Sequence, residues 1–200
     1  MIAIVDYEMG NLGSVAKALK WLGADAVISS DPAIIDQASA VILPGVGAME
    51  YAIERLESLK LDLAIKRAVS SGRPFLGICL GMQLMFQTSE EGNARGLGIL
   101  PGRVRRFGQL PGLKIPHMGW NRLDEANDVH LETGEYYYFV HSFFCEPEQA
   151  DITAAVSRHG CQFTAAVRQN NVLLTQFHPE KSGDSGLRLL SSWLSKEVNL

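Results

Sequence analysis

Three short segments carry the side chains that could perform covalent chemistry. An apolar run leads into Gly77-Ile78-Cys79-Leu80-Gly81, and a helical pattern follows. Gly-x-Cys-x-Gly is the thiol counterpart of the Gly-x-Ser-x-Gly nucleophile elbow, in which a sharp strand-to-helix turn holds a strained nucleophile. The positive end of the following helix favours the thiolate, and its first N–H groups point toward a developing oxyanion. Alone, the pattern fits a small buried cysteine equally well.

A base and a second set of hydrogen-bond donors follow two other expected strands. His178 comes just after one strand end, and Glu180 could orient its imidazole as the acid does in a Ser-His-Asp triad. Pro44-Gly45-Val46-Gly47 follows another strand and offers flexible backbone amides. Each segment alone could be an ordinary loop. Because ligands bind at the carboxyl edge of parallel sheets, the three together predict a nucleophile, a base and an oxyanion hole at one edge.

The elements that would position these segments alternate between strand and helix in the first half of the chain. Apolar runs predict strands at 2–6, 26–28, 40–43 and 74–78, and helical spacing predicts helices at 15–22, 49–70 and 80–87. Repeated strand–helix units predict an α/β fold with a mostly parallel, twisted central sheet flanked by helices.

The second half predicts an additional antiparallel strand region. Strands are expected at 97–107, 136–144, 151–157, 162–168 and 172–176, before a closing helix at 186–196. Asn170-Asn171 predicts a tight hairpin turn, because asparagine tolerates positive φ. Residues 108–112 are expected to form a loop rather than a domain boundary. We therefore expect one domain over residues 1–200.

Composition and charge disfavour several classes of function. The 200 residues include 18 basic and 22 acidic ones without a basic block, which argues against nucleic acid as a partner. No apolar run reaches the roughly 18 residues that cross a bilayer, and the N-terminus lacks a signal-peptide pattern. Cys79, Cys145 and Cys161 form neither a disulfide framework nor a metal-binding pair. We expect a cytoplasmic protein without metal or cofactor, in which Cys145 and Cys161 pack between strands.

The three segments resemble the class I, or triad, glutamine amidotransferases, which implies a flavodoxin-like fold. The family's elbow is matched by Gly77 to Gln83, its oxyanion strand by Pro44 to Gly47, and its last motif by His178-Pro179-Glu180. Within that class the chain most resembles the glutaminase subunits of imidazole glycerol phosphate synthase, of histidine biosynthesis. The similarity spans nearly the whole chain, including 6–11, 44–48, 116–121, 138–142 and 176–182. One departure is Glu8, where a Tyr-Gly-Met-Gly-Asn loop would have glycine.

The resemblance implies a role for each matched residue. Cys79 would attack the side-chain amide of L-glutamine, assisted by His178, which Glu180 orients. Oxyanion donors would be Leu80 and the strand at Val46 and Gly47. Substrate-binding residues would be Gly45, Gln83, Glu91 and the backbone of His141, Ser142 and Phe143. Glu90 and Glu91 could instead be a solvated pair, and the His141 side chain could be structural.

The resemblance also implies a partner chain. Ammonia in water is mostly ammonium at neutral pH, which is not nucleophilic, so a synthetic glutaminase must deliver ammonia directly. The acceptor is expected on a (β/α)8-barrel cyclase subunit, in a heterodimer with this chain. Interface residues would be Asn11, Met118, Trp120 and Lys181, although Met118 and Trp120 could equally be core. We expect the 45–47 amides to be misaligned until the partner binds its own ligand.

Three alternatives stay open at the level of sequence. The chain could be the glutaminase of another pathway, such as anthranilate, aminodeoxychorismate or pyridoxal phosphate synthesis. It could be a non-catalytic binding module on the same fold, which the intact Cys79, His178 and Glu180 set argues against. It could also be a thiol protease of similar fold, which the His178–Glu180 arrangement disfavours.

Overall fold

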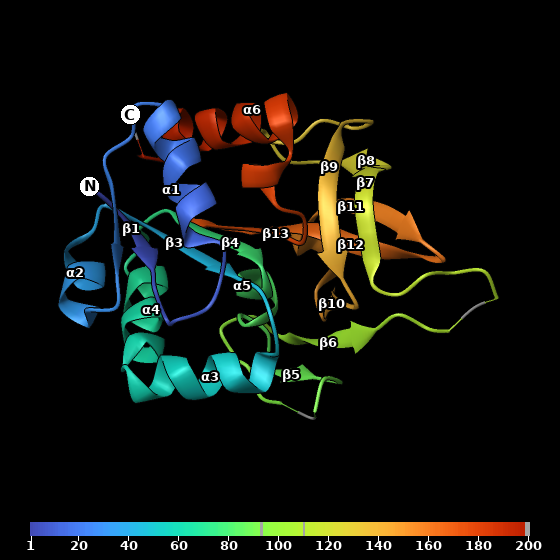
Figure 1. Cartoon of the computed structure of the whole chain (residues 1–200), viewed down its shortest axis with the longest axis horizontal. Helices are drawn as coiled ribbons and strands as arrows, with labels where there is room; N and C mark the ends of the chain where they lie inside the picture. The colour runs from blue at the N-terminus through green and yellow to red at the C-terminus, as the bar shows by residue number, and fades with distance from the viewer. Residues whose placement is uncertain (93, 110, 199–200) are drawn as a thin grey trace.

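A computed structural model of the chain describes residues 1–92, 94–109 and 111–198 (Figure 1). Its first half contains β1 (Ile2–Val5), α1 (Leu12–Trp21), β2 (Ala26–Ser29), α2 (Pro32–Gln37), β3 (Ala40–Gly45), α3 (Met49–Ser58), α4 (Leu61–Ser70), β4 (Phe75–Cys79), α5 (Leu80–Gln83) and β5 (Thr88–Ser89). The strands β6 (Gly102–Arg106), β7 (His117–Arg122), β8 (Glu125–Ala126), β9 (Tyr136–His141), β10 (Phe143–Pro147), β11 (Thr153–His159), β12 (Cys161–Gln169) and β13 (Val172–Thr175) follow. Helical segments η1 (Ala150–Ile152), η2 (Pro179–Lys181), α6 (Gly183–Trp193) and η3 (Leu194–Val198) complete the description.

Most of the described strands form one mixed sheet. Its order is β2-β1-β3-β4-β13-β12-β10-β6-β5, with β11 joined to β12 and β8 joined to β11. Strands β2, β1, β3, β4 and β13 are parallel, whereas β12, β10 and β6 pair antiparallel. A second, two-stranded antiparallel sheet consists of β7 and β9. The expected α/β class, with a parallel sheet and an added antiparallel region, is confirmed.

Strand β1 illustrates why both faces of the parallel sheet are covered. All four of its residues are buried, and they alternate between two cores. Ala3 and Val5 pack with residues of α2, α3 and α4, whereas Ile2 and Ile4 pack with residues of α1 and α6, on the opposite face (Figure 1). Burying the side chain of Ile2, Ile4 or Val5 contributes about 1.5–3 kcal/mol. The carboxyl ends of β3, β4 and β13 therefore project from a tightly packed platform.

Two expected helices have different bounds in the structure. The helix expected at 49–70 is two helices, because Lys60 adopts a left-handed conformation at φ +59° and redirects the chain into α4. The break lets Leu56 and Leu61 both reach the core. The helix expected at 80–87 ends at Gln83. Carbonyl oxygens of the following turn instead accept hydrogen bonds from residues 97–100.

The strand expected at 136–144 is wrong as a single element, and the difference matters for the site. Its first part, β9, pairs with β7, and its second part, β10, pairs with β6 and β12 of the large sheet. The chain changes sheets at Ser142, whose carbonyl oxygen accepts a hydrogen bond from the Phe107 N–H. The strand expected at 97–107 begins only at Gly102, because residues 97–100 bond to the turn after α5.

The structure also bears on the expected hairpin turn, on two of the cysteines, on the loop at 108–112 and on membrane spans. Asn170 has φ +51° in the β12–β13 turn, so the expected hairpin is confirmed. Cys145 is buried as expected, but Cys161 is exposed because it begins β12 at the end of a hairpin. The loop expected at 108–112 includes residue 110, which lies outside the described residues. No helix in the described part of the chain is long and apolar enough to cross a membrane.

Candidate active site

Cys79 ends β4 and begins α5 in a strained conformation. Its φ of +56° and ψ of −107° are rare for a residue with a side chain, and such outliers cost on the order of 1–3 kcal/mol. The flanking glycines permit the turn. A Cβ on Gly81 would lie 1.8 Å from the Leu43 carbonyl oxygen, and one on Gly77 would lie 2.6 Å from Cδ2 of Leu174. The sharp elbow expected from Gly-x-Cys-x-Gly is therefore present.

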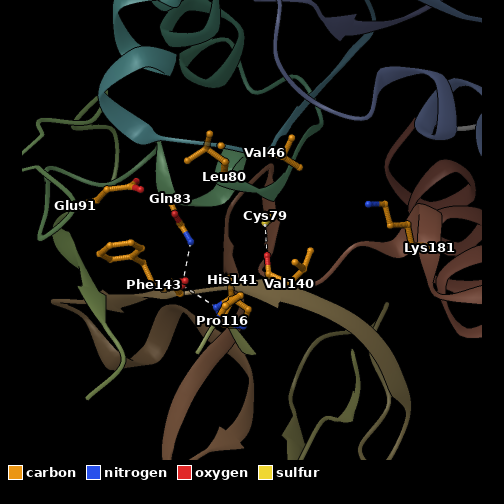
Figure 2. Close-up of a pocket in the computed structure, with 12 residues that line it drawn as sticks. Val46, Cys79, Leu80, Gln83, Glu91, Pro116, Val140, His141, Phe143 and Lys181 are labelled. Carbon is orange, nitrogen blue, oxygen red and sulfur yellow. Dashed lines mark hydrogen bonds between the residues drawn. The ribbon is translucent and has the colours of Figure 1, made fainter. Parts of the chain in front are cut away.

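Cys79 lies on the wall of a cavity of about 380 Å³. Most of the expected site residues line it: Val46, Gly47, Cys79, Leu80, Gln83, Glu91, His141, Ser142, Phe143 and Lys181. Figure 2 shows Cys79 in the middle, with Glu91 and Gln83 on one side and Lys181 on the other. Cavities of this size suit a single small molecule. The cavity thus has a polar end beside Glu91 and a distinct end beside Lys181.

The end of β3 forms the wall opposite the elbow. β3 pairs in parallel with β4, and Gly45 lies in register with Cys79. Beyond the strand, the N–H groups of Val46 and Gly47 donate no backbone hydrogen bond among the described residues. Gly47 has φ +102°, and a Cβ there would lie 2.6 Å from the Cε of Met9. Two uncommitted backbone donors therefore lie beside the nucleophile on a segment that requires glycine.

Gly45 has a different setting from the one expected. Among the described residues, Val46 and Gly47 line the cavity, whereas Gly45 does not. A Cβ on Gly45 would lie 2.2 Å from the Tyr7 hydroxyl oxygen, and this hydroxyl donates a 3.0 Å hydrogen bond to the Pro44 carbonyl. Burial raises the pKa of Tyr7 well above its ordinary value, so the phenol stays a donor. Gly45 provides space for Tyr7 to anchor the strand.

His178 and Glu180 form a buried pair. Nδ1 of His178 lies 2.8 Å from Oε1 of Glu180, which fixes the ring, and the His178 N–H donates to the Tyr138 carbonyl at 2.9 Å. Burial alone lowers the pKa of His178, but the charge and hydrogen-bond interactions with Cys79 and Glu180 outweigh it and raise the pKa to about 10. His178 is therefore an imidazolium at neutral pH.

The second nitrogen of His178 is the one that can exchange a proton. Nε2 is buried and has no hydrogen-bond partner of normal geometry among the described residues. The contact between this ring and the Cys79 sulfur, which contributes to the raised pKa of His178, therefore falls short of a normal hydrogen bond. Catalytic contacts of this kind are often loose without substrate and tighten when it binds.

Gln83 contacts the polar wall of the cavity rather than pointing freely into it. Its Nε2 donates at 3.1 Å to the Phe143 carbonyl and at 3.1 Å to Oε1 of Gln176. Gln176, which is fully buried, donates in turn to the Cys79 sulfur at 3.7 Å. Sequence reasoning did not single out Gln176, although it stands two residues before His178. Gln83 and Gln176 therefore connect the Phe143 backbone to the nucleophile.

Glu90 and Glu91 are not an ordinary solvated pair. Oε2 of Glu91 accepts a 2.9 Å hydrogen bond from the Met49 N–H at the start of α3, and the residue lines the cavity. Glu90 instead accepts a 2.8 Å hydrogen bond from the Arg106 N–H on β6. Of the two carboxylates, Glu91 is the one placed to meet a ligand.

The residues expected at a partner interface lie at the surface. Met118 is 63% exposed and Trp120 is 56% exposed, which rules out the alternative that they belong to the core. Lys181 is exposed at one end of the cavity, and Asn11 is half-buried before α1. Trp120 lies 6.3 Å from the ring of Tyr138, whose carbonyl holds the His178 N–H. The exposed Trp120 is thus connected to His178 through a single residue, Tyr138.

Comparison with known proteins identifies the family of this chain. The family model described as glutamine amidotransferase class-I matches residues 3–195. The chain is 51% identical to imidazole glycerol phosphate synthase subunit HisH of Thermosynechococcus vestitus, over 97% of this chain and 96% of that one. It is 48% identical to the protein of the same name from Trichodesmium erythraeum, over 98% of this chain and 95% of that one.

Solved structures share the fold at lower identity. A crystal structure of a glutamine amidotransferase superposes with a TM-score of 0.74 at 20% identity, covering 98% of both chains. The structure of PurLQS from Thermotoga maritima gives a TM-score of 0.72 at 20% identity, covering 97% of both chains.

These relatives decide among the alternatives that the sequence left open. The similarity is nearly full-length, and both relatives are named as subunits of the same synthase. Together with the family model, this excludes the sibling pathways, the thiol protease and the non-catalytic module. The chain belongs to the class I glutamine amidotransferases and, among them, to the glutaminase subunits of imidazole glycerol phosphate synthase.

Proposed function

We propose that this chain hydrolyses L-glutamine to L-glutamate and ammonia through a Cys79–His178–Glu180 triad. It acts as one domain over residues 1–200, in the cytoplasm, and without metal or cofactor. The single observation that carries the proposal is the strained Cys79 on the cavity wall at the end of β4, together with the buried, hydrogen-bonded His178–Glu180 pair.

The reaction starts from a thiolate–imidazolium pair. The Cys79 thiolate attacks Cδ of glutamine, and the carbonyl becomes a tetrahedral oxyanion. The imidazolium of His178 gives its Nε2 proton to the amine as the C–N bond breaks, so that neutral ammonia leaves. A γ-glutamyl thioester on Cys79 and a neutral imidazole remain.

Backbone donors stabilise the oxyanion. The N–H of Leu80, first in α5, has no partner within its helix, and the N–H groups of Val46 and Gly47 are uncommitted. Removing one such donor typically costs about 2.7–4 kcal/mol of barrier. The 46–47 peptide reaches this position only after it reorients, as the positive φ of Gly47 permits.

Water completes the turnover. Neutral His178 takes a proton from the water that attacks the thioester, and the second tetrahedral intermediate expels the Cys79 thiolate. The new γ-carboxylic acid loses its proton to solvent, and the thiolate–imidazolium pair is restored. Glu180 keeps the ring oriented through both halves of the reaction.

The polar end of the cavity holds the amino-acid part of glutamine. Glu91 lines this end and is the acceptor for the α-ammonium. The N–H groups of Ser142 and Phe143 lie where the chain changes sheets and bind the α-carboxylate. Gln83, whose nitrogen is committed to Phe143 and Gln176, presents its oxygen to the substrate.

Ammonia then passes to a partner chain. The partner is a (β/α)8-barrel cyclase subunit, which joins the ammonia to a phosphoribulosyl formimino aminoimidazole carboxamide ribotide. Its products are imidazole glycerol phosphate and an aminoimidazole carboxamide ribotide. The heterodimer interface includes Asn11, Met118, Trp120 and Lys181. The exposed Met118 and Trp120 match the residue types enriched in interface cores.

Glutamate release by three forms of the chain, each with the cyclase subunit, tests this proposal. Wild type is expected to be active, Cys79→Ala inactive, and Cys145→Ala as active as wild type. Cys145 is the matched control, because burial raises the pKa of its thiol and keeps it protonated. Glutamine hydrolysis retained by Cys79→Ala would contradict the proposal. Equal wild-type rates alone, with cyclase, and with cyclase plus its nucleotide would contradict the reorientation of the 46–47 peptide.

A further inference from the structure

We propose that His117 and Asn121 of β7 are positioning residues for the glutamine site: they fix the tautomer of His141 and so hold the Phe143 backbone. The inference rests on the proposed function, because it assigns these residues to the substrate's polar end. It concerns the face of β7 that is turned into the protein.

The hydrogen bond between His141 and Phe143 determines where the first proton lies. Nδ1 of His141 lies 2.7 Å from the Phe143 carbonyl oxygen. A carbonyl can only accept, so Nδ1 carries the hydrogen. Burial, opposed by this hydrogen bond, lowers the pKa of His141 to about 3, and the ring is therefore neutral at physiological pH. Its Nε2 is then bare and needs a donor.

His117 is that donor, and Asn121 completes the chain. Nδ1 of His117 lies 3.0 Å from Nε2 of His141 and must carry a hydrogen. Burial lowers the pKa of His117 to about 4, so its Nε2 is bare in turn and accepts from Nδ2 of Asn121 at 3.2 Å. The same amide donates at 2.9 Å to the Arg158 carbonyl. Because both amide hydrogens have fixed acceptors, the direction of every hydrogen bond in the series is determined.

The series ends at the centre of the candidate site. The Phe143 carbonyl accepts from both His141 and Gln83, and Gln83 leads through Gln176 to the Cys79 sulfur. Figure 2 shows Gln83 and His141 converging on the Phe143 carbonyl from two sides. A carbonyl held by two donors fixes the peptide planes next to it. The N–H of Phe143, one peptide earlier along the chain, is one of the two groups proposed to bind the α-carboxylate.

Strand β7 connects this series to the proposed interface. Met118 and Trp120 are more than half exposed, whereas His117 is buried and Asn121 is half-buried. Alternate residues of a strand point to opposite faces, so one face of β7 meets the partner and the other holds His141. A shift of β7 on docking would therefore move the glutamine-binding backbone through two imidazole rings.

The histidine cluster around His117 serves hydrogen bonding and stacking. His159 stacks on His117 with ring centroids 4.1 Å apart and bonds to the Lys114 carbonyl at 2.8 Å. In the described part of the chain, no group of three or more His, Cys, Asp or Glu residues is arranged to hold a metal ion. The positioning role needs no further ligand.

The test compares two substitutions of His117 in complex with the cyclase subunit and its nucleotide. His117→Phe keeps a ring but removes the donor, and should raise the glutamine KM about five- to tenfold while kcat changes less than about twofold, as expected for one lost hydrogen bond. His117→Asn supplies an N–H near the position of Nδ1 and should restore most of the KM. The matched control is His130→Asn, which should leave KM unchanged. His130 is a buried histidine that bonds to Ser192 and Glu197 outside the site.

A second measurement is independent of activity. The ¹⁵N shifts of the imidazoles in wild type should show His141 and His117 both protonated on Nδ1 at pH 7. A proton on Nε2 of His141 would overturn the inference, as would a folded His117→Phe protein with a wild-type KM. If His117→Phe does not fold, the wild-type tautomers alone decide. A wild-type protein without glutaminase activity would count against the proposed function but not against this hydrogen-bond series.

Discussion

Nδ1 of His178 lies 2.8 Å from the carboxylate of Glu180, two residues further along the chain, and both side chains are almost wholly buried. The short turn Pro179–Lys181 brings them together, because the residue between them is a proline at the start of η2. The pair orients the ring so that Nε2 is the only nitrogen left for proton transfer. This arrangement makes the role of Glu180 testable without altering the nucleophile.

Glu180→Gln should keep the shape of the site but remove the charge that supports the imidazolium. We expect kcat with the cyclase partner to fall by about 10²- to 10⁴-fold, and the pKa of His178, followed by NMR, to fall below the wild-type value of about 10. Glu90→Gln is the matched control, because Glu90 bonds to the β6 backbone outside the cavity. Wild-type turnover in Glu180→Gln would exclude it from the triad.

Gly47→Ala should damage the oxyanion hole. The new Cβ would have to fit at φ +102° and 2.6 Å from the Cε of Met9, so the 46–47 peptide must move. We expect kcat to fall about 10²- to 10³-fold, the usual effect of losing one oxyanion donor. Gly13→Ala in α1 is the control, because no atom lies within 4 Å of its added Cβ. Similar kcat values for the two variants would show that Gly47 contributes no donor.

Glu8 occupies a position where the related loop has glycine, and its two effects oppose each other. Its φ of +67° is strained, at about 1–2 kcal/mol, but its carboxylate lies 2.5 Å from Arg55 on α3. An exposed ion pair of this kind contributes about 0.2–1 kcal/mol, and glycine gains entropy in the unfolded chain. Glu8→Gly should therefore change the free energy of unfolding by less than about 1 kcal/mol.

Arg55→Met separates the two effects, because it removes the ion pair and leaves the backbone of residue 8 unchanged. Urea unfolding should show a destabilisation no larger than about 1 kcal/mol. A loss of several kcal/mol would mean that the pair holds the loop against the rest of the protein more firmly than its exposure suggests.

The neutral, buried His141 should make the protein less stable in mild acid. Its folded-state pKa is about 3 because burial, with His117, His159 and His178 adding to it, outweighs the bond to Phe143. Its unfolded value is about 6.5. Between these values only the unfolded chain takes up the proton, so stability falls as the pH drops from 6.5 toward 3.

Urea unfolding at pH 5 and pH 6 measures this contribution, because most carboxylates titrate at lower pH. His141→Asn should reduce the slope of unfolding free energy against pH by up to about 1.4 kcal/mol per unit. His178 does not interfere in this range. Its raised pKa gives stability that is fully present below 6.5 and is lost as the pH rises through about 10. An unchanged slope would mean that His141 is protonated in the folded protein.

The parts of the site that were predictable depend on local sequence. The elbow at Cys79 follows from an apolar strand meeting two glycines, and the His178–Glu180 pair spans only three residues. Tyr7 and Gln176 were missed because their roles come from tertiary contacts, with Pro44 and with the Cys79 sulfur. Both residues lie in segments that carry the resemblance, but the sequence does not show what their side chains contact.

The strands that were predicted wrongly also depend on tertiary contacts. The pattern from Tyr136 to Phe144 is continuously strand-like, but the chain changes partners at Ser142 because β7 and β6 belong to different sheets. Strand β7 was not predicted, because Gly119 and the polar residues His117 and Asn121 do not form the alternating apolar pattern of a strand. In the structure Gly119 has φ +125°. Those polar residues are the ones that bond to His141.

Mass spectrometry of the protein, acid-quenched during turnover with glutamine and the cyclase partner, tests the central claim most directly. We expect a γ-glutamyl thioester on the peptide that contains Cys79, absent from Cys79→Ala, and lost at the rate of glutamate release. A γ-glutamyl group on Cys145 or Cys161 instead, or continued glutamate formation by Cys79→Ala, would contradict it.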